Sequence, residues 1–214
     1  APSLQELRAH ESKIEWLPDF YALPQLANIS LYGNNIADIS SLASLSGYKS
    51  LDLSANQISN ISVLSSFSNL TSLNLSDNII VDISPLENSN NLTTLNLNNN
   101  QISNLEMADT GVIADMTLLT ELNLGNNQLT SVESLSLTAL TLLETLNLSA
   151  NLMTDISTLQ VPQSLSSLKL NDNSLTDISV LLNWSTLPDF IDISGNLISC
   201  AQQDELTVKA VGKT

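Results

Sequence analysis

Apolar and polar positions recur in one fixed order along the whole chain. Residues 70–80 and 92–102 both follow the pattern L-x-x-L-x-L-x-x-N-x-I, in which most x positions are polar. Nine units of this kind begin at Leu4, Leu26, Tyr48, Leu70, Leu92, Leu119, Leu143, Leu165 and Pro188. Most spacings are 22 residues, and the others are 27, 24 and 23 residues. This period excludes a coiled coil, which repeats every seven residues. The alternation inside each unit predicts a short β-strand.

Each unit divides into a strand and a return segment. In the fifth unit we expect Leu95 and Leu97 to point into the core and Asn96 to point outward, so that successive strands stack side by side. The return segment repeats the phrase Asp-Ile-Ser or Asn-Ile-Ser, at residues 38–40, 60–62, 82–84, 155–157 and 177–179. The isoleucine anchors this segment to the core, and the flanking polar side chains cap a 3-10 turn. The pattern therefore predicts nine parallel strands and little regular α-helix.

An asparagine ends the strand of every unit except the first, which has Ser12 in this place. The eight residues are Asn34, Asn56, Asn78, Asn100, Asn127, Asn151, Asn173 and Asn196. An amide side chain offers donors and an acceptor to the bending backbone, whose polar groups would otherwise be buried unpaired. We interpret these asparagines as structural rather than ligand-binding residues.

The repeating pattern is the signature of leucine-rich repeat proteins. The phrase Asp-Ile-Ser-Pro-Leu at residues 82–86, followed by Asn-Leu-Thr-Thr-Leu at 91–95, resembles the repeats of the internalin family of bacterial surface proteins. It also looks like the cytosolic phosphatase-regulating class of 22-residue repeats. The resemblance covers about residues 4–199. It implies an α/β solenoid, a right-handed horseshoe with a parallel β-sheet on the concave face and 3-10 turns and loops on the convex face. In internalins the concave face typically binds a host protein.

The repeats predict one domain over residues 1–214, because a single unit cannot bury its apolar face alone. The pattern ends after Ile198, and residues from about 200 to 211 are expected to form a C-terminal cap. We expect Cys200 to be buried beneath this cap and His10 to lie on the surface of the first unit.

Composition narrows the classes of function. The chain has 22 Asp and Glu, 6 Lys and Arg, and a net charge of −16. Residues 50–168 hold eleven carboxylates and no cation, which argues against binding to nucleic acid. One His and one Cys supply neither a zinc site nor an internal disulfide, and no apolar run approaches the ~18 residues of a membrane-spanning helix. Since no catalytic motif occurs, we expect no enzymatic activity, no cofactor and no metal.

Localisation rests on weaker signals. The chain is rich in Ser, Thr and Asn, poor in Lys, and starts without Met. The chain has seven Asn-x-Ser/Thr triplets, and several of them fall on or beside the predicted strands, where glycans would crowd the sheet. These features favour an extracellular or surface-exposed bacterial protein, and a cytoplasmic scaffold is the alternative.

The concave face is the candidate binding surface, since an open face on a parallel sheet is unusual. Its predicted partner-binding residues are Tyr32, Asp52, Asn74, Asn96, Asn123, Asn147, Lys169, Phe190 and Asp192. Energetic hot spots of interfaces favour Trp, Tyr and Arg, and only Arg8, Tyr32 and Phe190 qualify on this face, all toward its two ends. The four asparagines either bond to one another as a ladder or form a polar docking strip. Both interpretations stay open.

A longer fifth unit offers a second candidate surface. Residues 103–118 form an insertion with three carboxylates on the expected convex side, and insertions into repeats often bind partners. Calcium ligation there lacks the usual spacing of acidic residues, and a solvated loop is the simpler interpretation.

We expect a monomeric, non-catalytic protein-recognition module whose partner is a protein with a basic or neutral surface. The alternatives are a structural spacer of a larger surface protein and a cytosolic regulatory scaffold subunit.

Overall fold

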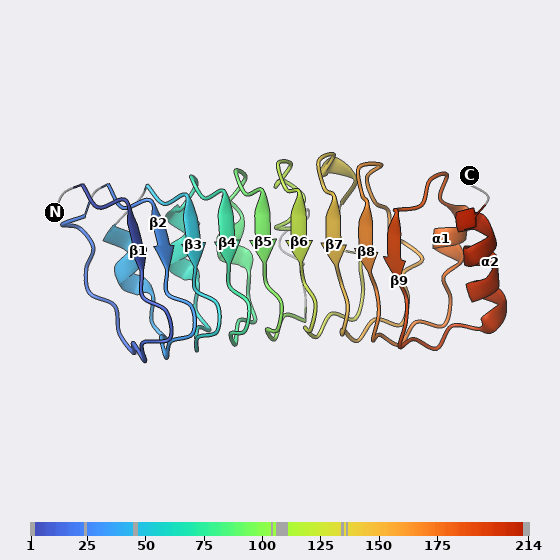
Figure 1. Cartoon of the computed structure of the whole chain (residues 1–214), viewed down its shortest axis with the longest axis horizontal. Coiled ribbons are helices and arrows are strands. Elements are labelled where there is room, and N and C mark those ends of the chain that lie inside the picture. The colour runs from blue at the N-terminus through green and yellow to red at the C-terminus, as the bar shows by residue number, and fades with distance from the viewer. Residues whose placement is uncertain are drawn as a thin grey trace.

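Nine short strands, one from each repeat unit, form a single parallel sheet. The computed structural model describes residues 3–23, 25–44, 47–103, 105, 111–133, 135 and 137–211. Within this part of the chain the strands lie side by side in the order of the sequence (Figure 1). They are β1 (Glu6–Arg8), β2 (Asn28–Ser30), β3 (Ser50–Asp52), β4 (Ser72–Asn74), β5 (Thr94–Asn96), β6 (Glu121–Asn123), β7 (Thr145–Asn147), β8 (Ser167–Lys169) and β9 (Phe190–Asp192). The structure confirms the predicted leucine-rich repeat solenoid.

The sheet register follows the sequence pattern, because equivalent positions of neighbouring units pair directly. Leu73 lies opposite Leu95, and Asn74 lies opposite Asn96. Leu95 is the buried middle residue of β5, while its two neighbours are half-buried on the other face. A period-two strand places its side chains on alternate faces. The sheet therefore has one face on the core and one open face, which we call the concave face.

The return segments contain short turns of helix on the convex side. They are η1 (Ser40–Ser44), η2 (Ser62–Ser66), η3 (Ser84–Leu86), η4 (Leu137–Ala139) and α1 (Ser179–Asn183). In each Asp-Ile-Ser or Asn-Ile-Ser phrase the first side chain accepts a hydrogen bond from the serine N–H, at 2.7–2.9 Å. This bond fixes the start of each turn. The 3-10 prediction holds for η1 to η4, whereas the eighth unit forms a five-residue α-helix.

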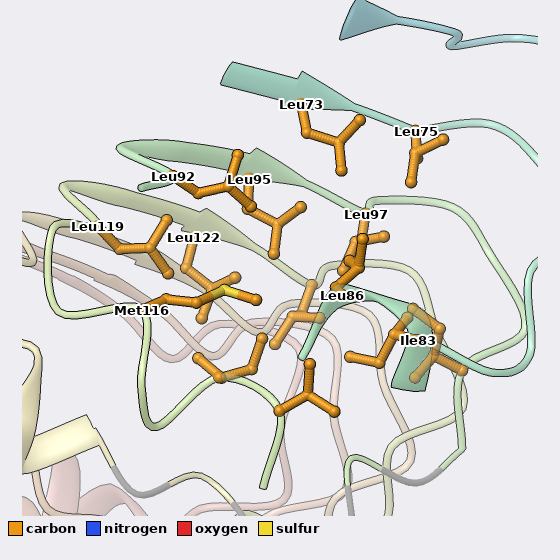
Figure 2. Packing of buried hydrophobic residues seen from close by; sticks show 14 of the residues in the cluster. Leu73, Leu75, Ile83, Leu86, Leu92, Leu95, Leu97, Met116, Leu119 and Leu122 are labelled. Carbon is orange, nitrogen blue, oxygen red and sulfur yellow. The ribbon is translucent and has the colours of Figure 1, made fainter. Parts of the chain in front are cut away.

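Leucine and isoleucine side chains fill the space between the sheet and the return segments. Leu92, Leu95 and Leu97 of one unit are fully buried. Figure 2 shows them in layers between Leu73 and Leu75 of the preceding unit and Leu119 and Leu122 of the following unit. The same cluster runs from Phe20 to Ile198. Each unit is therefore stabilised by burial against both neighbours.

A column of asparagine side chains connects successive units at the ends of the strands. The Nδ2 of Asn100 donates to the carbonyl oxygens of Leu97 in its own unit and Leu75 in the preceding unit, at 3.1 and 3.0 Å. Its Oδ1 accepts from the N–H of Ile80 at 3.0 Å. The same three kinds of bond are made by Asn34, Asn56, Asn78, Asn127, Asn151, Asn173 and Asn196. Six of the eight are buried, Asn56 and Asn196 being half-buried.

The last unit is followed by α2 (Cys200–Val211), which packs against α1 at the C-terminal end of the solenoid (Figure 1). Leu206 packs against the core cluster, and the Lys209 ammonium donates to the Leu182 carbonyl oxygen at 2.9 Å. The prediction for Cys200 is wrong, since its thiol is exposed. Cys200 is the first residue of α2, whereas Leu206, in the second turn of this helix, makes the contact with the core. Among the described helices none is long and apolar enough to cross a membrane.

The contact between α2 and the eighth unit should depend on the charge of Asp177. Its carboxylate accepts from the N–H of Ser179 at 2.8 Å and from Nε2 of Gln202 at 2.6 Å. These bonds hold the pKa of Asp177 below its usual value, and the bond from the Ser179 N–H has the largest effect. A lowered folded pKa stabilises the fold above the unfolded pKa of about 3.9, and the contribution is lost as the pH falls through the folded value.

We therefore expect hydrogen exchange in α2 to accelerate as the pH is lowered below about 4, after correction for the intrinsic exchange rate. The matched control is Asp177→Asn, since Asn60 makes the same bond to Ser62 without a titrating group. Its α2 exchange should lack this pH-dependent step. An identical step in the variant would contradict the assignment to Asp177.

Candidate functional site

Seven of the nine predicted partner-binding residues occupy one continuous row across the concave face. The sheet register pairs each with the next, in the order Asp52, Asn74, Asn96, Asn123, Asn147, Lys169 and Asp192. Phe190 begins β9 at one end of the face, and Tyr32 follows β2 near the other. Tyr32 is therefore separated from Lys169 and Phe190 by a row of short polar side chains.

The asparagines of this row bond to their own backbone rather than to one another. The Oδ1 of Asn74, Asn96 and Asn123 accepts from the N–H two residues later, at 3.1 Å in each case. Asn147 makes the equivalent bond at 2.9 Å, and Asp52 and Asp192 use a carboxylate oxygen in the same way. Such bonds fix the turn that ends each strand. Among the described residues no hydrogen bond joins two asparagines of this row, so the ladder, one of the two interpretations left open, does not form here.

A ladder does occur three residues further along each unit, beyond the C-terminal ends of β4, β5 and β6, and we call it the edge ladder. Nδ2 of Asn126 donates to Oδ1 of Asn99 at 2.6 Å, and Nδ2 of Asn99 donates to Oδ1 of Asp77 at 2.7 Å. This column adopts positive φ, between 48° and 70°, at Glu11, Gly33, Ala55, Asp77, Asn99, Asn126, Ala150, Asp172 and Gly195. Asn and Asp tolerate this backbone region better than most residues. In this left-handed backbone conformation the side chains of Asp77, Asn99 and Asn126 reach one another across neighbouring units.

The N-terminal end of the concave face carries a connected group of side chains. The rings of His10 and Tyr32 pack with centroids 5.0 Å apart and a tilt of 56°. The Tyr32 hydroxyl donates to Oε1 of Glu11. Nε2 of His10 lies 2.8 Å from Oγ of Ser30, and this hydroxyl donates to Oδ2 of Asp52 at 3.2 Å. We call these five residues the N-terminal cluster.

Carboxylates dominate the electrostatics of the N-terminal cluster. The bond to Glu11 and the charge of Glu11 raise the pKa of Tyr32, with smaller effects of burial and of the Asp52 charge. The nearby Arg8 guanidinium lies 2.6 Å from the Glu6 carboxylate, both groups being exposed. Because an exposed pair of this kind contributes little to stability, its main effect is to offset the positive charge of Arg8.

The C-terminal end of the concave face differs in character. Phe190 is 49% exposed, and Lys169 is exposed in the neighbouring strand. The hydroxyl and N–H of Ser194 hold the pKa of Asp192 below its usual value, with a smaller effect of the Lys169 charge. Behind the start of β9 a groove of about 320 Å³ lies between residues 161–166 and 186–189. Pro188, which replaces the usual leucine, lines this groove.

The second candidate surface lies partly outside the described residues. Residues 104 and 106–110 of the 103–118 insertion are not among them, while 112–115 form turns and Ile113 and Met116 are buried. Within the described part of the chain no three His, Cys, Asp or Glu side chains are arranged to hold a metal ion.

Sequence reasoning assigned Tyr32 and Asp52 to the concave face but missed their connection through His10, Glu11 and Ser30. The signal was present, because the 22-residue period places His10 next to Tyr32 and Ser30 next to Asp52 in neighbouring units. Expectations based on each residue type separately do not show which neighbours will hydrogen-bond.

Comparison with known proteins places the chain in a family. The family described as "Leucine Rich repeats (2 copies)" matches residues 24–66, 68–109 and 117–161. The chain belongs to the leucine-rich repeat family. A comparison with curated proteins gives no match.

Two solved internalins of Listeria monocytogenes are similar to the chain. One, inlF, has 30% identity and a TM-score of 0.76 over 96% of this chain and 65% of its own length. Internalin C2 has 29% identity and a TM-score of 0.75 over 91% of this chain and 80% of its own. The chain therefore spans a little less than two thirds of the first internalin.

A plant receptor extends the comparison. The ectodomain of the Arabidopsis thaliana membrane receptor kinase GASSHO1/SCHENGEN3 has 26% identity and a TM-score of 0.70. It covers 84% of this chain and 22% of its own length, and its structure was solved in complex with CASPARIAN STRIP INTEGRITY FACTOR 2.

Proposed function

We propose that this chain is a non-catalytic protein-recognition module of a secreted or surface-exposed bacterial protein, and that it binds its partner through the concave face. The observation that carries the proposal is the open sheet face itself. Every described helical turn lies on the other side of the sheet or at its end (Figure 1). Parallel sheets are normally covered on both faces, so an open one is available for a partner.

Three similar proteins support this use of the fold. The internalins suggest a bacterial surface protein, and the plant receptor was solved with a bound factor. Among the outward side chains, Tyr32, Lys169 and Phe190 are of the types that anchor interfaces. The middle of the face has only short polar side chains that bond to their own turns. We therefore place the energetically important contacts at its two ends.

The polar middle of the face also favours a second candidate, a structural spacer that binds no partner tightly. Site-specific photocross-linking in host or neighbouring-cell extract separates the two. A benzoylphenylalanine at Phe190 or Glu121, both exposed on the concave face, should give a cross-linked protein partner. The same group at Ser65 or Glu133, exposed on the return segments, serves as the control. Cross-links from the control positions alone would move the site to the convex side, and none from any position would favour the spacer.

A further inference from the structure

We propose that the partner contributes an arginine side chain that docks on Tyr32, between the carboxylates of Glu11 and Asp52. This inference rests on the proposed function, because it assigns a specific chemistry to the N-terminal end of the concave face. Three features of the N-terminal cluster support the proposal. They are the rigid aromatic ring of Tyr32, the carboxylates on both sides of that ring, and the fixed orientation of Asp52.

The ring of Tyr32 is held in place before any partner binds. His10 packs against it from the preceding unit, with ring centroids 5.0 Å apart, and the hydroxyl bonds to Glu11. Tyr32 is half-buried, so part of its surface stays open. A side chain that is already ordered loses little conformational entropy when a partner docks on it. The ring is therefore suited to be an anchor of the interface.

Negative charge lies on both sides of this ring. Glu11 comes from the first unit and Asp52 from the third, so the carboxylates flank Tyr32 of the second unit. The bond to Glu11 and the Glu11 charge raise the pKa of Tyr32, and the Asp52 charge adds a smaller effect in the same direction. Arg8, the cation in the same part of the sheet, is paired with Glu6. An incoming cation is thus attracted to this place.

The Asp52 carboxylate is fixed in orientation by its own contacts. Oδ1 accepts from the N–H and the hydroxyl of Ser54, at 3.1 and 2.6 Å, and Oδ2 accepts from the Ser30 hydroxyl. Because Ser30 donates its proton to Asp52, its oxygen is left to accept from Nε2 of His10. Oδ1 thus uses both of its lone pairs, and Oδ2 keeps one for a ligand.

An arginine fits this arrangement better than a lysine does. A guanidinium is planar, so it can stack on an aromatic ring and donate N–H groups sideways to carboxylates at the same time. A lysine ammonium offers a point charge without the flat face. The arrangement of an aromatic ring with carboxylates to either side therefore selects for arginine.

A peptide titration followed by NMR tests the proposal on the whole chain. The probe is acetyl-Gly-Ser-Arg-Ser-Gly-amide at low salt, and the matched control replaces arginine by citrulline, which has nearly the same shape but no charge. We expect shift changes confined to residues 10–11, 30–32 and 52, and binding about tenfold weaker for citrulline and several-fold weaker for lysine. Equal binding of arginine and citrulline, or shift changes elsewhere, would overturn the proposal.

Variants locate the contact. Asp52→Asn should fold, since Asn74 makes the same turn bond in the next unit, and it should weaken the arginine peptide about fivefold, as should Tyr32→Leu. The matched control is Asp77→Asn in the edge ladder, which should leave binding unchanged. Unchanged binding by Asp52→Asn would also overturn the proposal.

If photocross-linking finds a partner on the concave face but the peptide does not bind at Tyr32, only this inference fails. If the peptide binds there and no partner cross-links to the face, the proposed function fails.

Discussion

Replacing Asn100 or Asn127 with alanine should lower the free energy of unfolding by ~1 to 3 kcal/mol, because it leaves buried backbone groups unpaired. The Asn127 amide donates to the carbonyl oxygens of Leu97 and Leu124 at 2.9 and 3.1 Å and accepts from the N–H of Ile102 at 3.0 Å. These groups are buried, so water cannot replace the lost bonds. Denaturant midpoints of the variants and the unchanged chain measure the effect.

Asn96→Ala is the matched comparison, being the same substitution in the same unit as Asn100. The Asn96 side chain is half-buried and makes its bond to the N–H of Asn98 at the open face of the sheet. Water can reach that N–H after the substitution, so the loss of stability should be much smaller. Equal shifts of the midpoint for Asn96→Ala and Asn100→Ala would contradict the different roles that we assign to the two columns.

Substitutions at the two ends of the concave face should weaken partner binding most. We expect Tyr32→Ala and Phe190→Ala each to reduce the affinity about tenfold or more, since large aromatic side chains are enriched at the centres of interfaces and carry much of their binding energy. Asn96→Ala and Asn123→Ala should each have a small effect. For a basic partner, binding should also weaken with rising salt through a Debye length of about 10 Å at 0.1 M. Titration of each variant with the partner that photocross-linking identifies measures these affinities.

Because Tyr32 and Phe190 lie outside the buried core cluster, their variants should unfold at nearly the same denaturant concentration as the unchanged chain. The comparison variant is a chain trimmed of residues 108–111, in the insertion of the fifth unit. Loss of binding in the trimmed chain alone would place the site on the convex side and would refute the concave assignment.

The sequence was sufficient to predict the strands and the cap of each return segment, since these depend on contacts between residues at fixed spacings. Leu95 and Leu97 alternate with Asn96 within one strand, and Asp82 lies two residues before the Ser84 N–H that it caps. Equivalent positions then repeat in the next unit. One correct unit therefore predicted most of the others.

Features that depend on small local differences could not be predicted in this way. A ladder was considered for the column of Asn96, whose amide oxygen instead accepts from the N–H of Asn98, and a ladder forms in the column of Asn99, which bonds to Asp77 and Asn126. Cys200 was expected in the core, yet the side of α2 that faces the solenoid is set by where the helix begins. The contact of His10 with Tyr32 depends on side-chain rotamers, which the repeat pattern does not specify.

Carboxyl-group footprinting of the chain, with and without the partner that photocross-linking identifies, tests the central claim most directly. Asp52 and Glu121 lie on the concave face, while Glu87 and Glu133 are exposed on the return segments, so one experiment compares both sides of the solenoid. Binding through the concave face predicts that the partner protects Asp52 and Glu121 from modification and leaves Glu87 and Glu133 unchanged. Protection of Glu87 and Glu133 with Asp52 and Glu121 fully modified would contradict it.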